Sequence, residues 1–344
     1  MIEFEKEMKL CIRLAQKAIG KTSPNPMVGC VILDENGRII STGYHKKYGD
    51  FHAEREALNK IEKGQGDTLV VNLEPCCHYG KTPPCTDIII DKGIKRVVYG
   101  MKDPNPVVSG KGLKILSDAG IEIIGPIFEN ECRQLNEIFI KNKTKNLPYV
   151  ALKTATTIDG KISTSKGDSK WITSPKARNA GRRLRKKYDA ILTSSSTVIA
   201  DNPEMKHKNK IILDRDLKTD LNSKIYRQGN IYVFCAKEPQ VLKKRITYIK
   251  TPIIDNKLDI LFVLKKVFEL GITSIFVEAG GTLNGSFLQY IDKLYHFIAP
   301  KIISDNSAKS CFEGRNISKI TDCFSLKFIK NKNYYPDILN IYSK

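Results

Sequence analysis

Hydrophobic positions along the first part of the chain predict alternating helices and strands. Apolar residues at helical spacing predict a helix over residues 5–19, and a second amphipathic helix begins at His52. Short apolar runs bounded by turn residues predict strands at 27–33, 38–42, 68–73, 96–99 and 121–124, with a short helix at 113–119. This pattern predicts an α/β domain with one mixed sheet and helices on both faces.

A second series of the same kind follows a polar helix expected over residues 131–143. The segment Lys145-Asn146-Leu147-Pro148 marks the boundary, so we expect one domain over residues 1–145 and another over 146–344. The second domain shows strand patterns at 149–155, 190–192, 211–213, 231–234, 274–278 and 294–299, and helix patterns from Pro175 to about residue 187 and at 258–270. Both domains are long enough to bury a core of their own.

The net charge of +20 is uneven, with +3 in residues 1–145 and +17 in the remainder. Such an excess could attract nucleic acid or small phosphorylated anions. It could also be compositional drift, since the chain is rich in Lys, Ile and Asn almost everywhere. The basic residues are scattered and no aromatic-interleaved strip accompanies them, so we expect drift or small anions and no nucleic acid. No apolar run is long enough to span a bilayer, and the charged amino terminus lacks a secretory pattern. Nine cysteines without such a signal indicate a reducing cytoplasm, with thiols as ligands or core residues.

The stretch from His52 to Cys85 carries the strongest chemical pattern. It contains His-Ala-Glu at 52–54 and Glu-Pro-Cys-Cys-His-Tyr-Gly-Lys-Thr-Pro-Pro-Cys at 74–85. One imidazole and two thiolates, from His52, Cys76 and Cys85, suit a catalytic zinc that keeps a fourth position for water. Glu54, not itself a ligand, could then shuttle protons between that water and a leaving amine.

Alternatives to this zinc hypothesis exist for each residue. Zinc deaminases show Pro-Cys-x-x-Cys, whereas the second cysteine here lies nine positions after the first, so the match is incomplete. Free cysteines are often simply buried, and His52 could be a helix cap. Cys77 and His78 remain possible ligands. The combination of motifs nevertheless favours zinc catalysis over these alternatives.

A second pattern lies at residues 275–286, where a buried strand ends in a glycine turn and a helix begins. Backbone N–H groups at such a turn can hold phosphate, although a plain strand-to-helix turn has the same pattern.

Taken together, these residues resemble the family of bifunctional riboflavin-biosynthesis proteins, in which a pyrimidine deaminase is fused to a reductase. The resemblance covers nearly the whole chain and is carried by Pro-Asn-Pro-Met-Val-Gly at 24–29, the two zinc motifs, Asp-Pro-Asn-Pro at 103–106 and Lys-Trp-Ile-Thr-Ser at 170–174. The long spacing from Cys76 to Cys85 is this family's own. The resemblance therefore implies Zn²⁺ held by His52, Cys76 and Cys85, with Glu54 as proton shuttle and with Cys77 and His78 outside the zinc shell.

The resemblance also implies fold and substrate. It implies a cytidine-deaminase-like α/β/α sandwich with a mixed sheet, followed by a dihydrofolate-reductase-like α/β domain that binds NADPH. A phosphoribosyl diaminopyrimidine would lose its amine and then have its ribosyl group reduced to ribityl. The implied substrate contacts in the first domain are Asn25, His45, His78, Lys81, Thr82, Asp103 and Asn105. Amides and carboxylates can read a pyrimidine edge, and His and Lys can meet a phosphate, although the prolines beside Asn25 and Asn105 also fit simple turns.

For the reductase domain, the resemblance implies a second set of residues. The cofactor contacts would be Ala155, Trp171, Thr197, Asp201, Gly280, Gly281, Thr282, Leu283, Asn284, Gly285 and Ser286. The sugar phosphate would meet Ser169, Arg185, Met205, Lys208 and Glu278, with Arg185 as its clamp and Lys153 as a catalytic candidate.

This half also departs from the family pattern. Lys208 is the nearest candidate where the family has an arginine, the loop before Ile211 is short, Arg215 stands where a serine is common, and Ser194-Ser195-Ser196 stands where the family has a glycine. Two alternatives to a bifunctional enzyme stay open: a deaminase with a silent second domain, and a deaminase of nucleic-acid bases. The resemblance further implies a homodimer or larger homo-oligomer in the cytoplasm.

Overall fold

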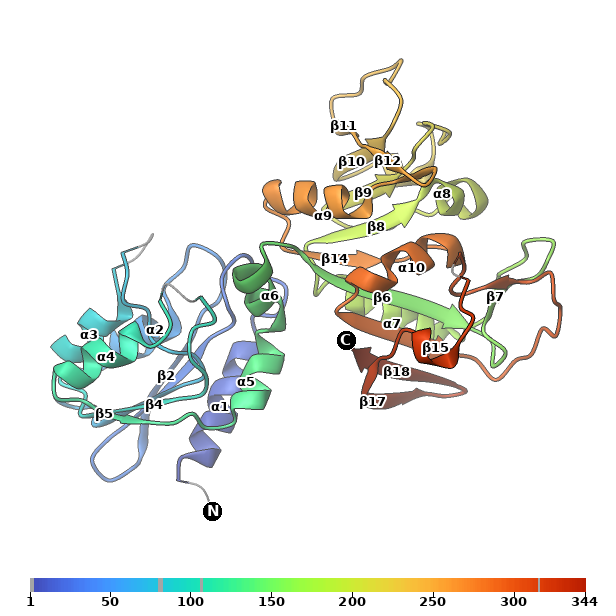
Figure 1. Cartoon of the computed structure of the whole chain (residues 1–344). Helices are drawn as coiled ribbons and strands as arrows, with labels where there is room; N and C mark the ends of the chain where they lie inside the picture. The colour runs from blue at the N-terminus through green and yellow to red at the C-terminus, as the bar shows by residue number, and fades with distance from the viewer. Residues whose placement is uncertain (1–2, 80–82, 106–107, 315) are drawn as a thin grey trace. The chain divides into compact units, whose positions relative to one another are not determined.

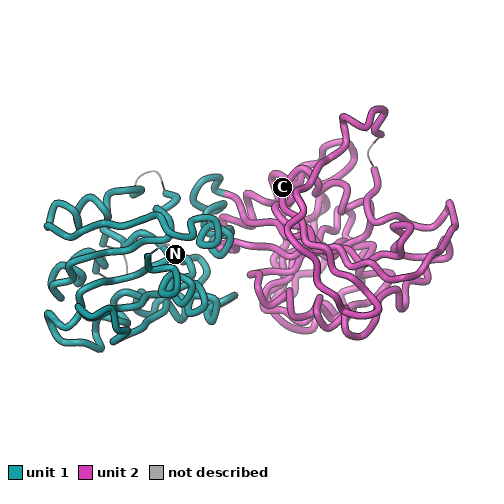
Figure 2. Tube along the Cα trace, turned by 90° about the horizontal axis from the view of Figure 1, so that it is seen from below, with its two compact units in different colours: residues 1–146 teal, residues 147–344 magenta. Residues whose placement is uncertain are grey.

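The computed structural model describes residues 3–79, 83–105, 108–314 and 316–344. The chain forms two compact units, Met1–Asn146 and Leu147–Lys344, which Figure 2 shows in separate colours. Each unit has its own sheet and its own buried hydrophobic cluster. In the described part of the chain, no helix has the length and apolar character needed to cross a membrane.

The first unit is built on a five-stranded mixed sheet in the order β2-β1-β3-β4-β5. Its strands are β1 Gly29–Leu33, β2 Ile39–Tyr44, β3 Thr68–Val71, β4 Arg96–Tyr99 and β5 Glu122–Ile124. Strand β1 is antiparallel to both of its neighbours, whereas β3, β4 and β5 are parallel. The central strands β1 and β3 are buried along their whole length, which explains their unbroken apolar runs.

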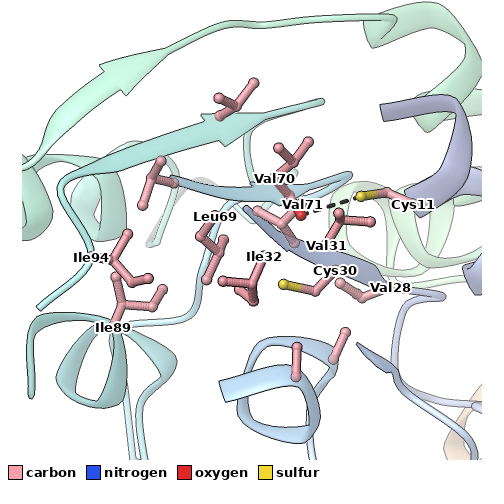
Figure 3. Close-up of a cluster of buried hydrophobic side chains, with 14 of the residues drawn as sticks. Cys11, Val28, Cys30, Val31, Ile32, Leu69, Val70, Val71, Ile89 and Ile94 are labelled. Atoms are coloured by element: carbon pink, nitrogen blue, oxygen red, sulfur yellow. Dashed lines mark hydrogen bonds between the residues drawn. The ribbon is translucent and has the colours of Figure 1, made fainter. Parts of the chain in front are cut away.

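Helices cover both faces of this sheet, as the sequence predicts. They are α1 Glu5–Gln16, α2 Ala53–Leu58, α3 Cys85–Asp91, α4 Lys111–Asp118, α5 Glu129–Leu135 and α6 Glu137–Lys145. Figure 3 shows Cys11 of α1 on one side of the strand layer and Ile89 of α3 on the other. The Cys11 thiol donates a hydrogen bond to the carbonyl oxygen of Val70 at 3.2 Å, which ties α1 to β3.

The prediction of a single polar helix over residues 131–143 is wrong, because the chain forms two helices, α5 and α6, with a break at Asn136. The Asn136 side chain is buried and turned toward the start of β1. Its Oδ1 accepts from the backbone N–H of Met27 at 2.8 Å, and its Nδ2 donates to the carbonyl of Met27 at 3.1 Å. Asn136 thereby fixes the chain next to Asn25.

The second unit is built on a nine-stranded sheet in the order β11-β10-β9-β8-β14-β6-β15-β18-β17. Its strands are β6 Tyr149–Thr156, β8 Ala190–Ser194, β9 Asn209–Leu213, β10 Asn230–Cys235, β11 Ile246–Lys250, β14 Ser274–Val277, β15 Lys293–Ile298, β17 Lys327–Tyr334 and β18 Asp337–Ser343. The seven strands from β11 to β15 in this order are parallel, and the β17–β18 hairpin adds two antiparallel strands at one edge. Strands β8, β14 and β6 lie side by side (Figure 1), so their carboxyl ends meet at one edge.

Two short pairings and the helices complete this unit. The pairs are β7 Lys161–Ser163 with β16 Lys309–Ser310, and β12 Ile253–Ile254 with β13 Lys257–Leu258. The helices are α7 Pro175–Arg185, α8 Ser195–Asp201, α9 Ile260–Glu269 and α10 Gly281–Phe287, with the 3₁₀ turns η1 Lys224–Tyr226, η2 Leu288–Tyr290 and η3 Ile320–Asp322. The hydroxyl of Ser174 caps α7 by accepting from the backbone N–H of Ala177 at 3.3 Å, with Pro175 in the first turn.

Candidate functional site

Three ligand-type side chains converge in the first unit, where two helices begin. His52 directly precedes α2, Cys85 is the first residue of α3, and Cys76 lies in the loop after β3. The Nδ1 atom of His52 lies 3.4 Å from the Sγ atom of Cys76 and 3.4 Å from that of Cys85. All three ligand atoms lie within 4.8 Å of one another.

These distances fit a zinc ion. In a tetrahedral site with ordinary Zn–N and Zn–S bond lengths, nitrogen and sulfur ligands lie about 3.5 Å apart. Backbone hydrogen bonds bring the two cysteines together although they are nine positions apart in the sequence. The N–H groups of Cys85 and Thr86 both donate to the carbonyl oxygen of Cys76, at 3.0 and 3.2 Å. Cys77 and His78 are not in this group of ligands among the described residues. The predicted set His52, Cys76 and Cys85 is therefore the one that the structure brings together.

The surroundings of the cluster lower the pKa of one thiol, Cys76, and raise the pKa of one carboxyl, Glu54. The Cys85 thiol and the His52 ring beside it lower the pKa of the Cys76 thiol to about 4. Glu54 lies in the first turn of α2 and is only 3 % exposed. Burial, reinforced by the charge of Cys76, raises the pKa of the Glu54 carboxyl to about 7.

Asn25 and His45 form one hydrogen-bonded unit beside this cluster. The ring of His45 packs edge-on against that of His52, with 5.6 Å between the ring centroids. Its Nδ1 lies 3.0 Å from the carbonyl oxygen of Phe51, which can only accept, so Nδ1 carries the proton. The Nε2 atom then accepts from the Nδ2 amide of Asn25 at 3.2 Å. Burial lowers the pKa of His45, which keeps the ring neutral in this role.

Glu74 and Asn72 are site residues that the sequence analysis missed. Asn72 accepts from the N–H of Gly29 at 2.7 Å and donates to the carbonyl of Met27 at 3.1 Å. Glu74 is buried and accepts from three backbone N–H groups of the segment that follows β4. Asn72 directly follows the apolar strand β3 and Glu74 directly precedes Pro75-Cys76, and polar side chains in these positions were the available signal.

The other predicted substrate residues of the first unit include both buried and exposed side chains. The Asp103 carboxyl accepts from the N–H of Asn105 at 2.8 Å, and burial raises its pKa. The side chain of His78 is exposed. Lys81 and Thr82 lie outside the described residues.

In the second unit, Lys153, Arg185 and Glu278 form a charged cluster. Lys153 lies on β6, Arg185 ends α7, and Glu278 directly follows β14, the strand beside β6. The Glu278 Oε2 atom accepts from the Arg185 Nε at 2.8 Å and forms an ion pair with the Arg185 Nη2 at 2.6 Å. Burial lowers the pKa of the Lys153 ammonium, while the charge of Glu278 opposes that shift and the charge of Arg185 adds to it.

The predicted cofactor residues lie at the same edge of the sheet. Ala155 lies two residues after Lys153 on β6, and Thr197 and Asp201 lie on α8, which follows β8. Ser194 caps α8 by accepting from the N–H of Thr197 at 3.3 Å, so the serine that departs from the family pattern serves as a helix cap. Trp171 is 59 % exposed, with the Arg178 guanidinium 4.2 Å from its ring centroid.

The run from Gly280 to Ser286 is partly covered by the chain itself. A Cβ atom at Gly281 would lie 2.2 Å from the carbonyl oxygen of Ser310, and one at Gly285 would lie 1.9 Å from that of Glu313. These two glycines therefore allow residues 310–313 to pack on α10. Gly280 is open, since a Cβ there would meet no atom within 4 Å. Thr282 is exposed, whereas Leu283 and Ser286 are half-buried.

The same region offers polar groups that a ligand could satisfy. The Asn284 side chain donates to the carbonyl of Cys311 at 2.9 Å. Its Oδ1 atom and the Oγ1 atom of Thr156, at the end of β6, are buried and have no hydrogen-bond partner among the described residues. Buried polar groups are rarely left unpaired, so these atoms fit a polar cofactor such as NADPH at this edge of the sheet.

Three predicted contacts are not part of the charged cluster. Met205 is buried in a hydrophobic cluster with Ile191 and Val198, so its side chain serves the core. Lys208 precedes β9 at the amino edge of the sheet, about 13 Å along the strands from the level of Glu278. Ser169 is half-buried in the loop between β7 and α7. The cationic side chains of the cluster are thus Arg185 and Lys153.

Comparisons with known proteins cover both units. Residues 148–339 match the family model described as the RibD C-terminal domain, and residues 1–101 match the cytidine and deoxycytidylate deaminase zinc-binding region. The riboflavin biosynthesis protein RibD of Aquifex aeolicus is 41% identical, with 94% of this chain and 93% of that protein covered. The RibD of Actinobacillus pleuropneumoniae is 37% identical over 96% of this chain and 93% of its own length.

Solved structures agree with the sequence relatives. A deaminase/reductase from Thermotoga maritima superimposes with a TM-score of 0.90 at 36% identity, covering 99% of this chain and 98% of that one. The expected fold classes of both domains and the two expected cofactors, Zn²⁺ and NADPH, are confirmed by these matches. The chain therefore belongs to the RibD family, the bifunctional deaminase–reductases of riboflavin biosynthesis.

Proposed function

We propose that the first unit deaminates diaminohydroxyphosphoribosylaminopyrimidine and that the second reduces the product, 5-amino-6-(5-phosphoribosylamino)uracil, to its ribityl form. The Thermotoga maritima protein is a diaminohydroxyphosphoribosylaminopyrimidine deaminase/5-amino-6-(5-phosphoribosylamino)uracil reductase, and its structure is similar to this chain over nearly its full length. The observation that carries the proposal is the presence of two complete and chemically different clusters, one in each unit. One suits hydrolysis of an amine, and the other suits a phosphorylated sugar.

His52, Cys76 and Cys85 would hold the Zn²⁺, which supplies an activated water when bound. Glu54, in the first turn of the helix that begins after His52, would take a proton from the attacking water and return it to the leaving amine. A C–O bond forms, the C–N bond breaks, and ammonia leaves. The burial of Glu54 keeps bulk water away from this proton transfer.

Asn25 would orient the pyrimidine through its Oδ1 atom. Its Nδ2 is held by His45, and the backbone on its carboxyl side is held by Asn136 and Asn72. Because both ring nitrogens of His45 have partners in the chain, His45 supports Asn25 and is not the phosphate contact that the sequence suggested. Asp103 and Asn105 would read the opposite edge of the ring, and His78, Lys81 and Thr82 would meet the ribose phosphate.

In the second unit, Arg185 and Lys153 would bind the sugar phosphate and the opened ribose, and Glu278 would hold the guanidinium in place. NADPH supplies the hydride when bound. Ala155, Trp171, Thr197, Asp201 and the run from Gly280 to Ser286 would hold it at the carboxyl ends of the parallel strands, where ligands bind in folds of this kind.

We also infer a cytoplasmic enzyme that forms a homodimer or larger homo-oligomer. All nine cysteines are free, which suits a reducing compartment. Size measurement by light scattering tests the oligomer, and a mass of one chain would contradict it.

The proposed function is tested by following ammonia and NADPH together. The purified protein with the diaminopyrimidine substrate should release ammonia without NADPH, and it should oxidise NADPH only as that ammonia is released. Release of ammonia without any NADPH oxidation would leave only the first half of the proposal. Absence of ammonia release from the zinc-loaded protein would contradict the proposed substrate.

A further inference from the structure

Glu74 joins the turn that carries Cys76 to the segment that carries Asp103. We propose that Glu74 is a positioning residue for deamination, which fixes the Asp103 segment (residues 101–105 and 108–112) relative to the zinc-ligand turn. This inference rests on the proposed role of Asp103 and Asn105 in reading the pyrimidine ring.

The Glu74 side chain is only 3 % exposed, and both of its oxygens accept from backbone N–H groups. The Oε2 atom accepts from Asp103 at 3.0 Å and from Gly110 at 2.9 Å, and Oε1 accepts from Gly112 at 3.0 Å. The Glu74 N–H also donates to the carbonyl of Met101 at 2.9 Å. One residue thus binds both ends of the Asp103 segment.

Helix α4 depends on this carboxylate for its cap. It begins after Gly110, and no side chain at its own N-cap position supplies a hydrogen bond. The first N–H groups of a helix need acceptors, and a negative charge there is favourable. Glu74, in the loop after β3, supplies α4 with both the acceptor oxygens and the negative charge.

The contact between α4 and the ligand turn is also close. A Cβ atom at Gly112 would lie 2.2 Å from the carbonyl oxygen of Pro75, the residue before Cys76. Because Gly112 has no side chain, the first turn of α4 can pack directly against the zinc-ligand turn. Glu74 and Gly112 together therefore set the distance between Cys76 and the Asp103 segment.

Ring placement follows from the same contacts. With its N–H held by Glu74, Asp103 accepts from the N–H of Asn105 at 2.8 Å, which fixes the second ring-reading residue. Small displacements of a substrate relative to its catalytic groups lower rates steeply. Losing Glu74 should therefore harm deamination without removing any zinc ligand.

The test is Glu74→Gln, which keeps size but replaces one acceptor oxygen by an NH₂ group that faces N–H donors. We expect kcat/KM for ammonia release to fall by about 10- to 100-fold, because a displacement of about 1 Å between substrate and catalytic groups can lower a rate by that much. Zinc should stay at one per chain, and the absorption spectrum of the Co²⁺-substituted protein should match wild type. Hydrogen exchange should quicken at Asp103, Gly110 and Gly112 but not at Cys85. Gly112→Ala, which pushes α4 from Pro75, should reproduce this pattern.

Two controls make the outcome decisive. Asp67 is a buried carboxylate at the other end of β3, bound to Arg96 at 2.7 Å. Asp67→Asn should lower stability but keep the wild-type kcat/KM. Asp103→Ala should lose deamination, and full activity of that variant would remove the proposed ring-reading role together with this inference. Wild-type kcat/KM in Glu74→Gln beside an inactive Asp103→Ala, or loss of zinc in Glu74→Gln, would overturn the positioning role alone.

Discussion

Removing Arg185 should destabilise the second unit and stop reduction. The Arg185 side chain is 23% exposed and that of Glu278 is 10% exposed, so the pair is largely screened from water. Arg185→Ala removes both contacts, at 2.8 and 2.6 Å, and leaves the buried Glu278 carboxylate without its hydrogen-bonded guanidinium.

The expected loss in the free energy of unfolding follows from the Glu278 carboxylate that has lost its partner. Hydrogen bonds to charged groups contribute about 1.5–3 kcal/mol each, and removing one partner of a buried pair costs about 3–5 kcal/mol. Because Arg185 is partly exposed, we expect a loss near the lower limit, about 3 kcal/mol. For a unit of this size, such a loss lowers Tm by about 6–12 °C.

Tryptophan fluorescence can report this unit selectively. The chain has one tryptophan, Trp171, which lies in the second unit. Urea unfolding followed by Trp171 should show the loss in Arg185→Ala and a partial recovery in the Arg185→Ala/Glu278→Ala double variant, where no buried carboxylate lacks its guanidinium partner. NADPH oxidation should fall in both variants, while ammonia release stays at the wild-type rate. A loss below about 1 kcal/mol, or a double variant no more stable than the single one, would refute the reasoning.

Three further predictions concern the two clusters. Glu54→Gln should abolish ammonia release while metal analysis still finds one zinc per chain, and loss of zinc would mean that Glu54 is structural. A chelator that strips zinc should stop ammonia release and lower the Tm of the first unit, but NADPH oxidation with the deaminated intermediate should continue; its loss would contradict two independent sites. Because burial lowers the pKa of Lys153 from its usual 10.5, this lysine loses its charge at a lower pH than usual, and reduction should decline as the pH rises, with the decline already under way before pH 10.5 is reached. A rate of NADPH oxidation that stays constant as the pH is raised to 10.5 would rule out a charged Lys153 in reduction.

The sequence predicts the strands of both units well where they are buried. Strands such as β3 and β14 are apolar throughout, so they appear as unbroken runs. Strand β17 of the β17–β18 hairpin was missed because it is exposed along nearly its whole length and is rich in lysine and asparagine. An edge strand of this kind has no hydrophobic face to reveal it.

Some site residues could be predicted from the sequence and others could not. The ligands His52, Cys76 and Cys85 were predictable because their chemistry is distinctive. Glu74 and Asn136 act on the backbone of segments far away in the sequence, at separations of 29 to 38 and 109 residues, which no local pattern shows. The place of Lys208 at the amino edge of the sheet depends on strand register, which its sequence position does not reveal.

The central claim is that one chain carries out two reactions at two separate sites. The most direct test measures both half-reactions in two variants, Glu54→Gln and Lys153→Met, with the diaminopyrimidine for ammonia release and the deaminated intermediate for NADPH oxidation. We predict that Glu54→Gln loses only ammonia release and that Lys153→Met loses only NADPH oxidation. Loss of both half-reactions in either variant would contradict the division into two sites.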